Sequence, residues 1–347
     1  MKEATDLTTG STLQSIDLNG ASILVTGGTG SFGQRFVSRI LNEYKPSRVV
    51  LFSRDEAKQH DMALSLPPSA YPALRYFIGD VRDGARLELA MRDIDVVVHA
   101  AAMKHVPTAE YNPFECIRTN VHGAENVVQA AMRTGVKRVI ALSTDKAANP
   151  INLYGASKLA SDKIFVAANN ISGSTGVRFS VVRYGNVIGS RGSIVPLYRR
   201  LIDEGAKALP ITDERMTRFW ITLDQGVDFV VKCIGMLRGG EIFVPKIASM
   251  KIVEVAAAMA PNLPQENVGI RPGEKLHEVM ITEDDARLTL ELDDCYIIEP
   301  AFAFWQREGY EESDAKRVDS GFRYASDTND NWLDRESFKK LLDELDS

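Results

Sequence analysis

Four side chains that can carry acid–base chemistry lie close together in the chain. Asp145 and Lys146 come directly after the apolar run Arg138–Thr144, and Tyr154 and Lys158 follow a little later. A tyrosine and a lysine four positions apart share one helix face, so the ammonium can lower the pKa of the phenol and also bind a ribose. This pattern is typical of an acid–base pair beside a hydride carrier, although the same spacing also occurs in plain surface helices.

A glycine-rich loop precedes these residues. Gly27, Gly30 and Gly33 lie where the run Ser22–Gly27 passes into the helical pattern of Phe32–Glu43. Glycines at such a turn let the backbone approach a pyrophosphate, and the N–H groups at a helix start favour its charge. A merely structural turn is the alternative. The loop residues that we expect to contact a dinucleotide are Gly27, Thr29, Gly30, Ser31, Phe32 and Gly33.

The end of the run Arg48–Ser53 indicates which dinucleotide binds. NAD enzymes usually have an acidic residue there for the ribose hydroxyls, whereas this chain has Ser53 and Arg54. A guanidinium holds a 2′-phosphate with two hydrogen bonds, so the sequence favours NADP. The alternative is a solvated Arg54 paired with Asp55. Further residues expected along the cofactor are Asp55, Lys58, Asp80, Val81 and Ala100.

Short β-branched runs alternate with helical patterns from Ala21 onward, which predicts a parallel sheet covered by helices on both faces. The expected strands are Ser22–Gly27, Arg48–Ser53, Leu74–Asp80, Asp95–Ala101, Arg138–Thr144 and Phe179–Gly185, and the expected helices include Phe32–Glu43, Asn120–Thr134 and Ser157–Asn169. The predicted fold class is therefore α/β, a Rossmann-like doubly wound sheet with a smaller C-terminal substrate-binding lobe.

The pattern also divides the chain. We expect a tail at 1–20, an NADP-binding domain at 21–185 to which later segments return, a mainly substrate-binding lobe at 186–285 and an extension at 286–347. The extension should end in an amphipathic helix that packs on the body and that Asn331 or Asp330 could cap. Its apolar stripe consists of Phe338, Leu341, Leu342 and Leu345.

The composition excludes several classes of protein. The chain has 347 residues, of which 44% are hydrophobic and 25% charged, so it can bury a core. Its net charge of −6 argues against nucleic-acid binding. Because neither a signal peptide nor a membrane span is evident, we expect a cytoplasmic protein. Cys116, Cys233 and Cys295 form no CxxC pair and the histidines have no ligand spacing, so we expect reduced cysteines and no metal.

The loop Gly27–Gly33, with Tyr154 and Lys158, resembles the extended short-chain dehydrogenases/reductases that modify nucleotide sugars. Four longer strings are similar to one family within that group, the inverting UDP-N-acetylglucosamine 4,6-dehydratases that open the pseudaminic acid pathway. These strings are STDKAANPINLYGASK, VVRYGNVIGSRGS, PITDERMTRFWITLD and GIRPGEKLHEVM. The similarity covers most of the chain from about Ile23 to Ile281.

The resemblance implies a reaction and a role for each catalytic residue. Tyr154 would take the proton of the 4-hydroxyl of UDP-GlcNAc while C4 passes hydride to NADP+, after which Lys146 would remove the C5 proton. Asp145 would protonate the leaving 6-hydroxyl, and the hydride would return to C6. The product would be UDP-2-acetamido-2,6-dideoxy-β-L-arabino-hex-4-ulose, destined for flagellin or a surface glycan. Thr144 and Lys158 complete the expected catalytic set.

The resemblance also implies residues that hold the substrate. Lys104 would reach both cofactor and substrate. Arg191, Arg271 and Asn186 would bind the diphosphate. Glu274 would accept a hydrogen bond from the uridine ribose. Each of them could instead be a solvated surface residue. Val187 and Lys146 complete the expected substrate set, and Arg215 and Arg218 are weaker candidates. Because such enzymes commonly form hexamers, we also expect a homo-oligomer.

Other interpretations stay open. A capsule or O-antigen dehydratase-epimerase is one, and a plain 4-epimerase would keep Tyr154 and Lys158 without needing Asp145 to eliminate water. A non-catalytic NADP-sensing module would need only the fold and the loop. The charge of Lys146 is open too, because a base requires its pKa to fall from about 10.4 to roughly 7–8. A salt bridge to Asp145 would oppose that fall.

Overall fold

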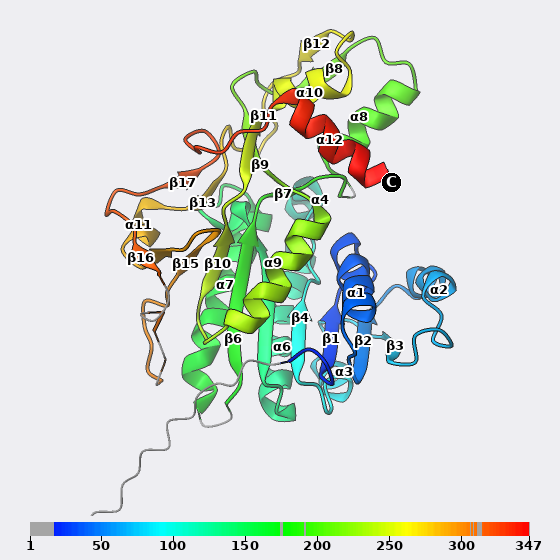
Figure 1. Ribbon diagram of the computed structural model, residues 1–347, viewed down its shortest axis with the longest axis vertical. Coiled ribbons are helices and arrows are strands. Elements are labelled where there is room, and N and C mark those ends of the chain that lie inside the picture. Colours follow the sequence, from blue (N-terminus) through cyan, green and yellow to red (C-terminus); the bar gives the residue numbers. More distant parts are fainter. Residues whose placement is uncertain are drawn as a thin grey trace, which may run out of the picture.

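A ten-stranded sheet forms the centre of the molecule, in the order β16-β14-β15-β10-β6-β5-β4-β1-β2-β3 (Figure 1). The computed structural model describes residues 17–346, apart from 174–175, 191, 306, 308 and 311–313. The strands predicted from the sequence are present as β1 (Ser22–Thr26), β2 (Arg48–Ser53), β3 (Leu74–Ile78), β4 (Val96–His99), β5 (Arg138–Thr144) and β6 (Arg178–Tyr184). They pair in parallel. From β1 the chain first builds the sheet toward one edge, through β2 and β3, and then toward the other edge, through β4, β5 and β6. Sheets of this kind hold their ligands in a crevice at the point where the direction reverses, beside β1.

Helices cover both faces of this sheet (Figure 1). On one face α1 (Ser31–Glu43) packs against α9 (Leu223–Met236), and on the other face α6 (Gly123–Thr134) lies between α3 (Gly84–Ala90) and α7 (Leu153–Ile171). Burial on both faces explains why these strands are nearly continuous β-branched runs. The predicted fold class is confirmed. The remaining helices beside this sheet are α2 (Glu56–Ser65), α4 (Val106–Tyr111), α5 (Pro113–Ile117) and α11 (Glu283–Ala286).

The predicted helix Asn120–Thr134 has a different start. A π-helical turn at Arg118–His122 joins α5 to α6, so the helical chain continues from Pro113. Within this turn Asn120 is buried, and its side chain accepts from Met103 N at 2.8 Å and donates to Met103 O at 2.9 Å. A π-helical turn adds a residue to a helix and re-aims a side chain, often at a functional site. Here it fixes the backbone next to Lys104.

Segments from later in the chain extend the sheet. β10 (Ile242–Pro245), β14 (Thr289–Glu291), β15 (Cys295–Ile298) and β16 (Lys316–Arg317) lie beyond β6. The lobe contains α8 (Ile194–Asp203), α10 (Ile252–Met259) and the small sheets formed by β7 (Asn186–Val187), β8 (Leu209–Ile211), β9 (Thr217–Ile221), β11 (Ala248–Lys251), β12 (Gln265–Asn267), β13 (Val279–Ile281) and β17 (Tyr324–Ala325). The C-terminal extension therefore adds strands to both parts of the molecule.

The last helix, α12 (Arg335–Asp346), packs on the body as predicted. Phe338 is fully buried with its ring 5.4 Å from that of Trp220, in a second core that belongs to the lobe. The predicted cap was wrong, because Asp334 accepts from Ser337 N at 2.7 Å. The chain is still extended near Asn331, whose carbonyl accepts from Ser249 N. That pairing delays the start of the helix.

Candidate active site

The glycine loop between β1 and α1 fits a dinucleotide. Gly27 has a φ of +67°, and a Cβ there would lie 2.8 Å from the backbone nitrogen of Ala101. A Cβ on Gly33 would lie 2.5 Å from Cα of Gly28, so no side chain fits between the helix and the loop. No side chain caps α1 at Gly30, so the N–H groups of its first turn are free to bind an anion. The first residues of α1 are the predicted Ser31 and Phe32.

The end of β2 presents a cation at the rim of this crevice. Arg54 is 62% exposed and lies 3.6 Å from Asp80, whereas Asp55 caps α2 and pairs with Lys58 at 2.6 Å. The alternative pairing of Arg54 with Asp55 is therefore wrong. Since an exposed ion pair is weak, the guanidinium can turn to a phosphate at little cost. The neighbouring Ser53 is buried and hydrogen-bonds Thr29 of the loop at 2.8 Å.

The ends of β3 and β4 continue the cofactor crevice. Asp80 binds the Arg82 guanidinium at 2.7 Å, and Val81 is buried behind it. Ala100 N donates to Thr26 O at 3.2 Å, so β4 continues straight beside the loop. Lys104 is exposed just beyond. Ala100 borders the glycine loop, because a Cβ on Gly27 would lie 2.9 Å from its carbonyl carbon. The contacts of Asp80, Val81 and Lys104 with a cofactor stay predictions.

The predicted catalytic residues come together where β5 ends and α7 begins. Asp145 and Lys146 lie in a 3-10 turn, and Tyr154 and Lys158 lie in the first turns of α7. A Cβ on Gly155 would overlap the carbonyl oxygen of Lys146, so only glycine lets the helix pack this close to the turn. The local sequence thus explains how the two pairs meet.

Asp145 has the geometry of a general acid. Its carboxyl is fully buried, and Oδ1 accepts from Thr144 Oγ1 at 2.9 Å and from Lys146 Nζ at 3.0 Å. Oδ2 is buried with no hydrogen-bond partner among the described residues. Burial and the charge of Glu278 raise the pKa of Asp145, although Lys146 opposes them. A protonated carboxyl with one open oxygen can donate a proton to a leaving hydroxyl.

Lys146 lies between two carboxylates. Its Nζ is 3.0 Å from Oδ1 of Asp145, 3.1 Å from Oε1 of Glu278 and 3.4 Å from Oδ1 of Asn186. Burial lowers the pKa of Lys146, but the two carboxylates outweigh it and raise the pKa above its ordinary value. In this structure Lys146 is therefore an ammonium, whereas the sequence left its charge open. Glu278 adds to the effect of Asp145, which is the larger of the two.

Tyr154 is a neutral phenol in this structure. Burial raises its pKa to about 12, while the charge of Lys146 and a hydrogen bond with Thr144 lower it. Lys158 is buried, and burial lowers its pKa while Asp162 opposes. Lys146 is thus the cation that most lowers the pKa of Tyr154, a role that the sequence analysis gave to Lys158. Lys146 has this effect because its ammonium is held at the side of the phenol by its two carboxylates.

The predicted substrate residues surround this cluster unevenly. Asn186 and Val187 form β7, half-buried beside Lys146, and Glu274 lies 3.4 Å from the Arg218 guanidinium. Arg271 is exposed on a loop that Asn152 anchors through Gly273 O at 2.7 Å. Arg191 lies outside the described residues.

The two weaker arginine candidates have other partners. Arg218 is 4% exposed and donates to the carbonyls of Leu276 and Lys275, so it supports the strand under the site. Arg215 is exposed and pairs with Asp213 at 2.8 Å. Arg215 therefore has a partner outside the cluster, whereas Arg218 reaches the cluster through Glu278, whose Oε1 lies 3.8 Å from Nε of Arg218.

Sequence reasoning missed Glu278. It is 1% exposed, and besides Lys146 it faces Arg218 at 3.8 Å and Lys275 at 3.6 Å. The available signal was a carboxylate directly before the apolar run Val279–Ile281. Which residues it would meet depends on the whole topology.

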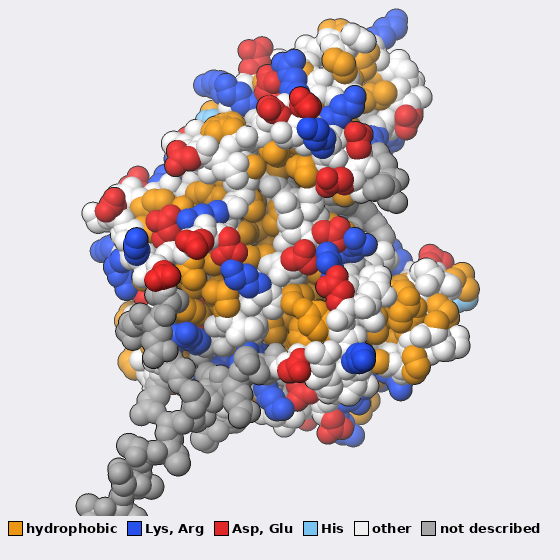
Figure 2. Space-filling view, in the orientation of Figure 1, with side chains coloured by type: hydrophobic (Ala, Val, Ile, Leu, Met, Phe, Trp, Pro, Cys, Tyr) orange, Lys and Arg blue, Asp and Glu red, His pale blue; other side chains and the backbone are white. Residues whose placement is uncertain are grey.

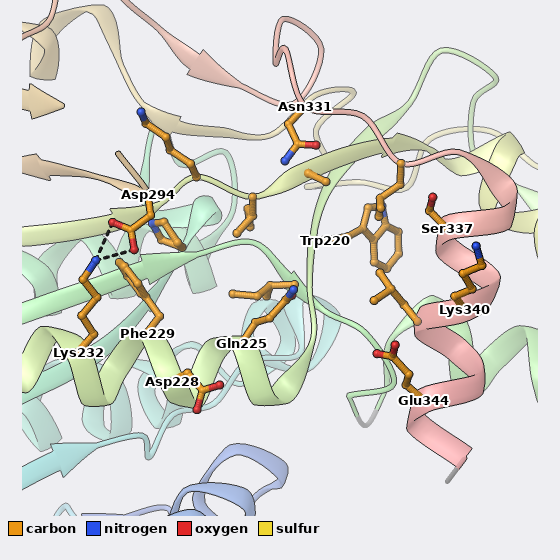
Figure 3. A pocket seen from close by; sticks show the side chains of 17 residues that line it. Trp220, Gln225, Asp228, Phe229, Lys232, Asp294, Asn331, Ser337, Lys340 and Glu344 are labelled. Atoms are coloured by element: carbon orange, nitrogen blue, oxygen red, sulfur yellow. Dashed lines mark hydrogen bonds and ion pairs between the residues drawn. The ribbon is translucent and has the colours of Figure 1, made fainter. Parts of the chain in front are cut away.

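A separate cavity of about 690 Å³ lies between α9, the β9–β11 pair and α12 (Figure 3). Its wall includes Trp220, Gln225, Lys232 and Asp294, and Lys232 pairs with Asp294 across one end. None of the predicted catalytic or binding residues lines it. It is therefore distinct from the candidate active site.

Three further observations concern the described residues. They contain no group of His, Cys, Asp and Glu arranged to hold a metal ion, and none of their helices is long and apolar enough to cross a bilayer. Cys116, Cys233 and Cys295 are buried free thiols. On the face seen in Figure 2, basic and acidic side chains are interspersed.

Comparison with known proteins decides the family. Residues 23–300 match the family model described as polysaccharide biosynthesis protein. The chain belongs to this family. This polysaccharide biosynthesis protein is 57% identical to an inverting UDP-N-acetylglucosamine 4,6-dehydratase of Campylobacter jejuni, over 94% of this chain and 97% of that protein. The resemblance predicted from the sequence is confirmed.

Solved structures give the same assignment of fold to this polysaccharide biosynthesis protein. Pen from Bacillus thuringiensis is 35% identical, with a TM-score of 0.86 over 95% of this chain and 99% of that chain. A dTDP-glucose 4,6-dehydratase from Streptomyces venezuelae, DesIV, solved with NAD and TYD bound, is 26% identical. Its TM-score is 0.65 over 74% of this chain and 86% of that chain. Such neighbours bind a nicotinamide dinucleotide in this fold.

Proposed function

We propose that the chain dehydrates UDP-GlcNAc at C4–C6 with inversion at C5, using NADP. The observation that carries this proposal is the buried carboxyl of Asp145, whose open oxygen lies in a cluster with Lys146 and Tyr154. Oxidation at C4 alone requires only the tyrosine, whereas loss of water also requires an acid for the 6-hydroxyl. A 4-epimerase or a non-catalytic NADP sensor gains nothing from that acid.

The residues divide the proposed reaction among themselves. The bound nicotinamide supplies the hydride acceptor and later the hydride donor. Tyr154 accepts the proton of the 4-hydroxyl as C4 is oxidised. The 4-ketone that forms makes the proton on C5 acidic. Lys146 takes that C5 proton as the free amine, once its own proton has passed to solvent, and Asp145 gives its proton to the 6-hydroxyl, so that water leaves and a C5–C6 double bond forms. Return of the hydride to C6 and addition of a proton to C5 on the opposite face complete the product. Lys158 and the loop Gly27–Gly33 hold the cofactor.

The substrate contacts are proposals on the same footing. Asn186 lies 3.4 Å from Lys146 and Glu274 lies 3.4 Å from Arg218, and we assign Val187, Arg271 and Lys104 to the same substrate site. The position of these residues supports a nucleotide diphosphate sugar, and the name of the Campylobacter relative supports UDP-GlcNAc. A place at the start of pseudaminic acid synthesis for flagellin or a surface glycan, a cytoplasmic location and a hexameric assembly remain predictions.

Proton NMR of the purified protein with UDP-GlcNAc in D2O tests the function. Without added cofactor and then with NADP+, we expect a new 6-methyl signal, deuterium at C5 and the couplings of an L-arabino ring. Persistence of the C6 methylene with inversion at C4 alone would establish an epimerase. No change in the sugar would support the sensor.

Arg54 should determine the preference for NADP. Arg54→Ala is expected to weaken NADP+ binding by about 10- to 100-fold, because a charge-assisted hydrogen bond contributes roughly 1.5–3 kcal/mol. NAD+ binding should stay unchanged, since NAD+ has no 2′-phosphate. Titration calorimetry with both cofactors measures this, with Arg133→Ala as the matched control, because Arg133 is an exposed arginine that pairs with Glu88 and belongs to none of the predicted binding residues. An equal loss for both cofactors would contradict the assignment.

A further inference from the structure

Glu278 connects the C-terminal extension to the catalytic cluster. Its Oε1 lies 3.1 Å from Nζ of Lys146, and the side chain is buried directly before β13. Its Oε2 is buried without a hydrogen-bond partner among the described residues, so hydrogen bonds do not fix the carboxylate from behind. The carboxylate must therefore be held by its backbone and by the cations around it.

Ser326 supplies the backbone anchor. Glu278 N donates to Ser326 Oγ at 2.9 Å, and Ser326 N donates to Glu278 O at 2.8 Å. Ser326 is fully buried, and its hydroxyl also hydrogen-bonds that of Thr217 at 2.7 Å. It directly follows β17, which pairs with β13. A residue of the extension thus fixes both backbone groups of Glu278.

We propose that Glu278 is a positioning residue that holds the Lys146 ammonium beside Asp145, and that Ser326 fixes Glu278 in that place. This inference rests on the proposed function, because it takes Lys146 as the base at C5. With Asp145 as its single charged partner and Asn186 as a long hydrogen bond, the ammonium would be held less firmly on the flexible lysine chain than it is between two carboxylates on different elements. The extension thereby becomes part of the active-site support.

The charge of Glu278 also affects the pH range in which Lys146 can remove the C5 proton. Glu278 is faced by Lys146, Arg218 and Lys275, and Lys146 is faced by Asp145, Glu278, Arg218 and the phenol of Tyr154. A carboxylate within about 4–6 Å favours the ammonium. Only the free amine takes the C5 proton, so this carboxylate moves C5 exchange to higher pH. Removing its charge should move the exchange to lower pH.

The variant Glu278→Gln tests this with two readouts over a range of pH. The first is deuterium incorporation at C5 of the sugar, and the second is reduction of the nicotinamide in a single turnover. We expect the acid limb of C5 exchange to move to lower pH by about one to three units. The reduction profile should not move to lower pH with it, because Tyr154 loses a stabilising charge, rather than gaining one, where Lys146 becomes the free amine. An unshifted limb, or equal slowing of both readouts, would overturn the proposal.

Ser326→Ala is the second variant, and it carries the test if Glu278→Gln does not fold. In Ser326→Ala the acid limb of C5 exchange should also move to lower pH, but by less than in Glu278→Gln. The double variant should show the same shift as Glu278→Gln alone, since both changes act through the one contact between Glu278 and Lys146. Ser326→Thr should restore the wild-type limb. The matched control is Asp327→Asn, a neighbouring carboxylate that pairs with Arg323 and leaves Lys146 untouched. If Asp327→Asn moved the acid limb of C5 exchange as far as Glu278→Gln does, the role of Glu278 would be overturned.

The outcome for the wild-type protein separates the two proposals. If the wild type exchanges the C5 proton but the acid limb of that exchange is unshifted in the variants, only the role of Glu278 is overturned. Absence of C5 exchange in the wild type, together with C4 chemistry, would overturn the proposed dehydration itself.

Discussion

Replacing Asp145 with asparagine is expected to slow formation of the 6-methyl product by about 100- to 10,000-fold, the usual contribution of a positioned general acid. Asparagine keeps the shape of the side chain and still accepts from Thr144, but it has no acidic proton to give. The 6-hydroxyl would then have to leave as hydroxide. Burial raises the pKa of Asp145 above its ordinary value, which favours the protonated form that this donation requires.

The steps before elimination should survive in this variant. Tyr154 still oxidises C4 and Lys146 still exchanges the C5 proton, so NMR in D2O should show deuterium at C5 of sugar that retains its 6-hydroxyl. The loss of one carboxylate beside Lys146 should itself favour the free amine. Product formed at the wild-type rate would contradict the role of Asp145. The cofactor affinity of the variant, measured by calorimetry, serves as the control for folding.

Replacing Tyr154 with phenylalanine should stop the reaction earlier. The phenol oxygen is the group that accepts the 4-hydroxyl proton, and its loss is expected to lower nicotinamide reduction by about 100- to 10,000-fold. C5 exchange should disappear in parallel, because the C5 proton is acidic only beside a 4-ketone. A single-turnover measurement of reduction, with deuterium incorporation in the same sample, distinguishes this variant from Asp145→Asn.

The pH dependence of the wild type checks the same role. Tyr154 accepts a proton only as phenolate, and its pKa is about 12 in the ligand-free protein. Nicotinamide reduction should therefore rise with pH below that value, and the rise should vanish in Tyr154→Phe. Rapid C4 oxidation by Tyr154→Phe would show that another group accepts the proton. Retained binding of NADP+ and UDP-GlcNAc is the control for an intact site.

Local sequence was sufficient for the parts of the molecule that local rules govern. The β-branched runs predicted β1 to β6 to within a few residues, because strands buried on both faces must be apolar. The loop Gly27–Gly33 and the pair Tyr154 and Lys158 could be read directly, since their spacing already places them at a turn and on one helix face. The resemblance to the nucleotide-sugar dehydratases supplied roles for Asp145 and Lys146, and the family match confirmed the resemblance.

The tertiary structure decided the charge and support of the site. Glu278, Ser326 and Lys146 are far apart in the chain and meet only because β13 lies against β17 beside the end of β5. That contact adds a second carboxylate that, with Asp145, raises the pKa of Lys146. The start of α12 was also decided in this way. Asn331 stays extended because its carbonyl accepts from Ser249 N, a contact that no local pattern shows, and the helix is capped later, by Asp334. A pKa depends on burial and on neighbours in space, and neither quantity is written in the spacing of residues along a chain.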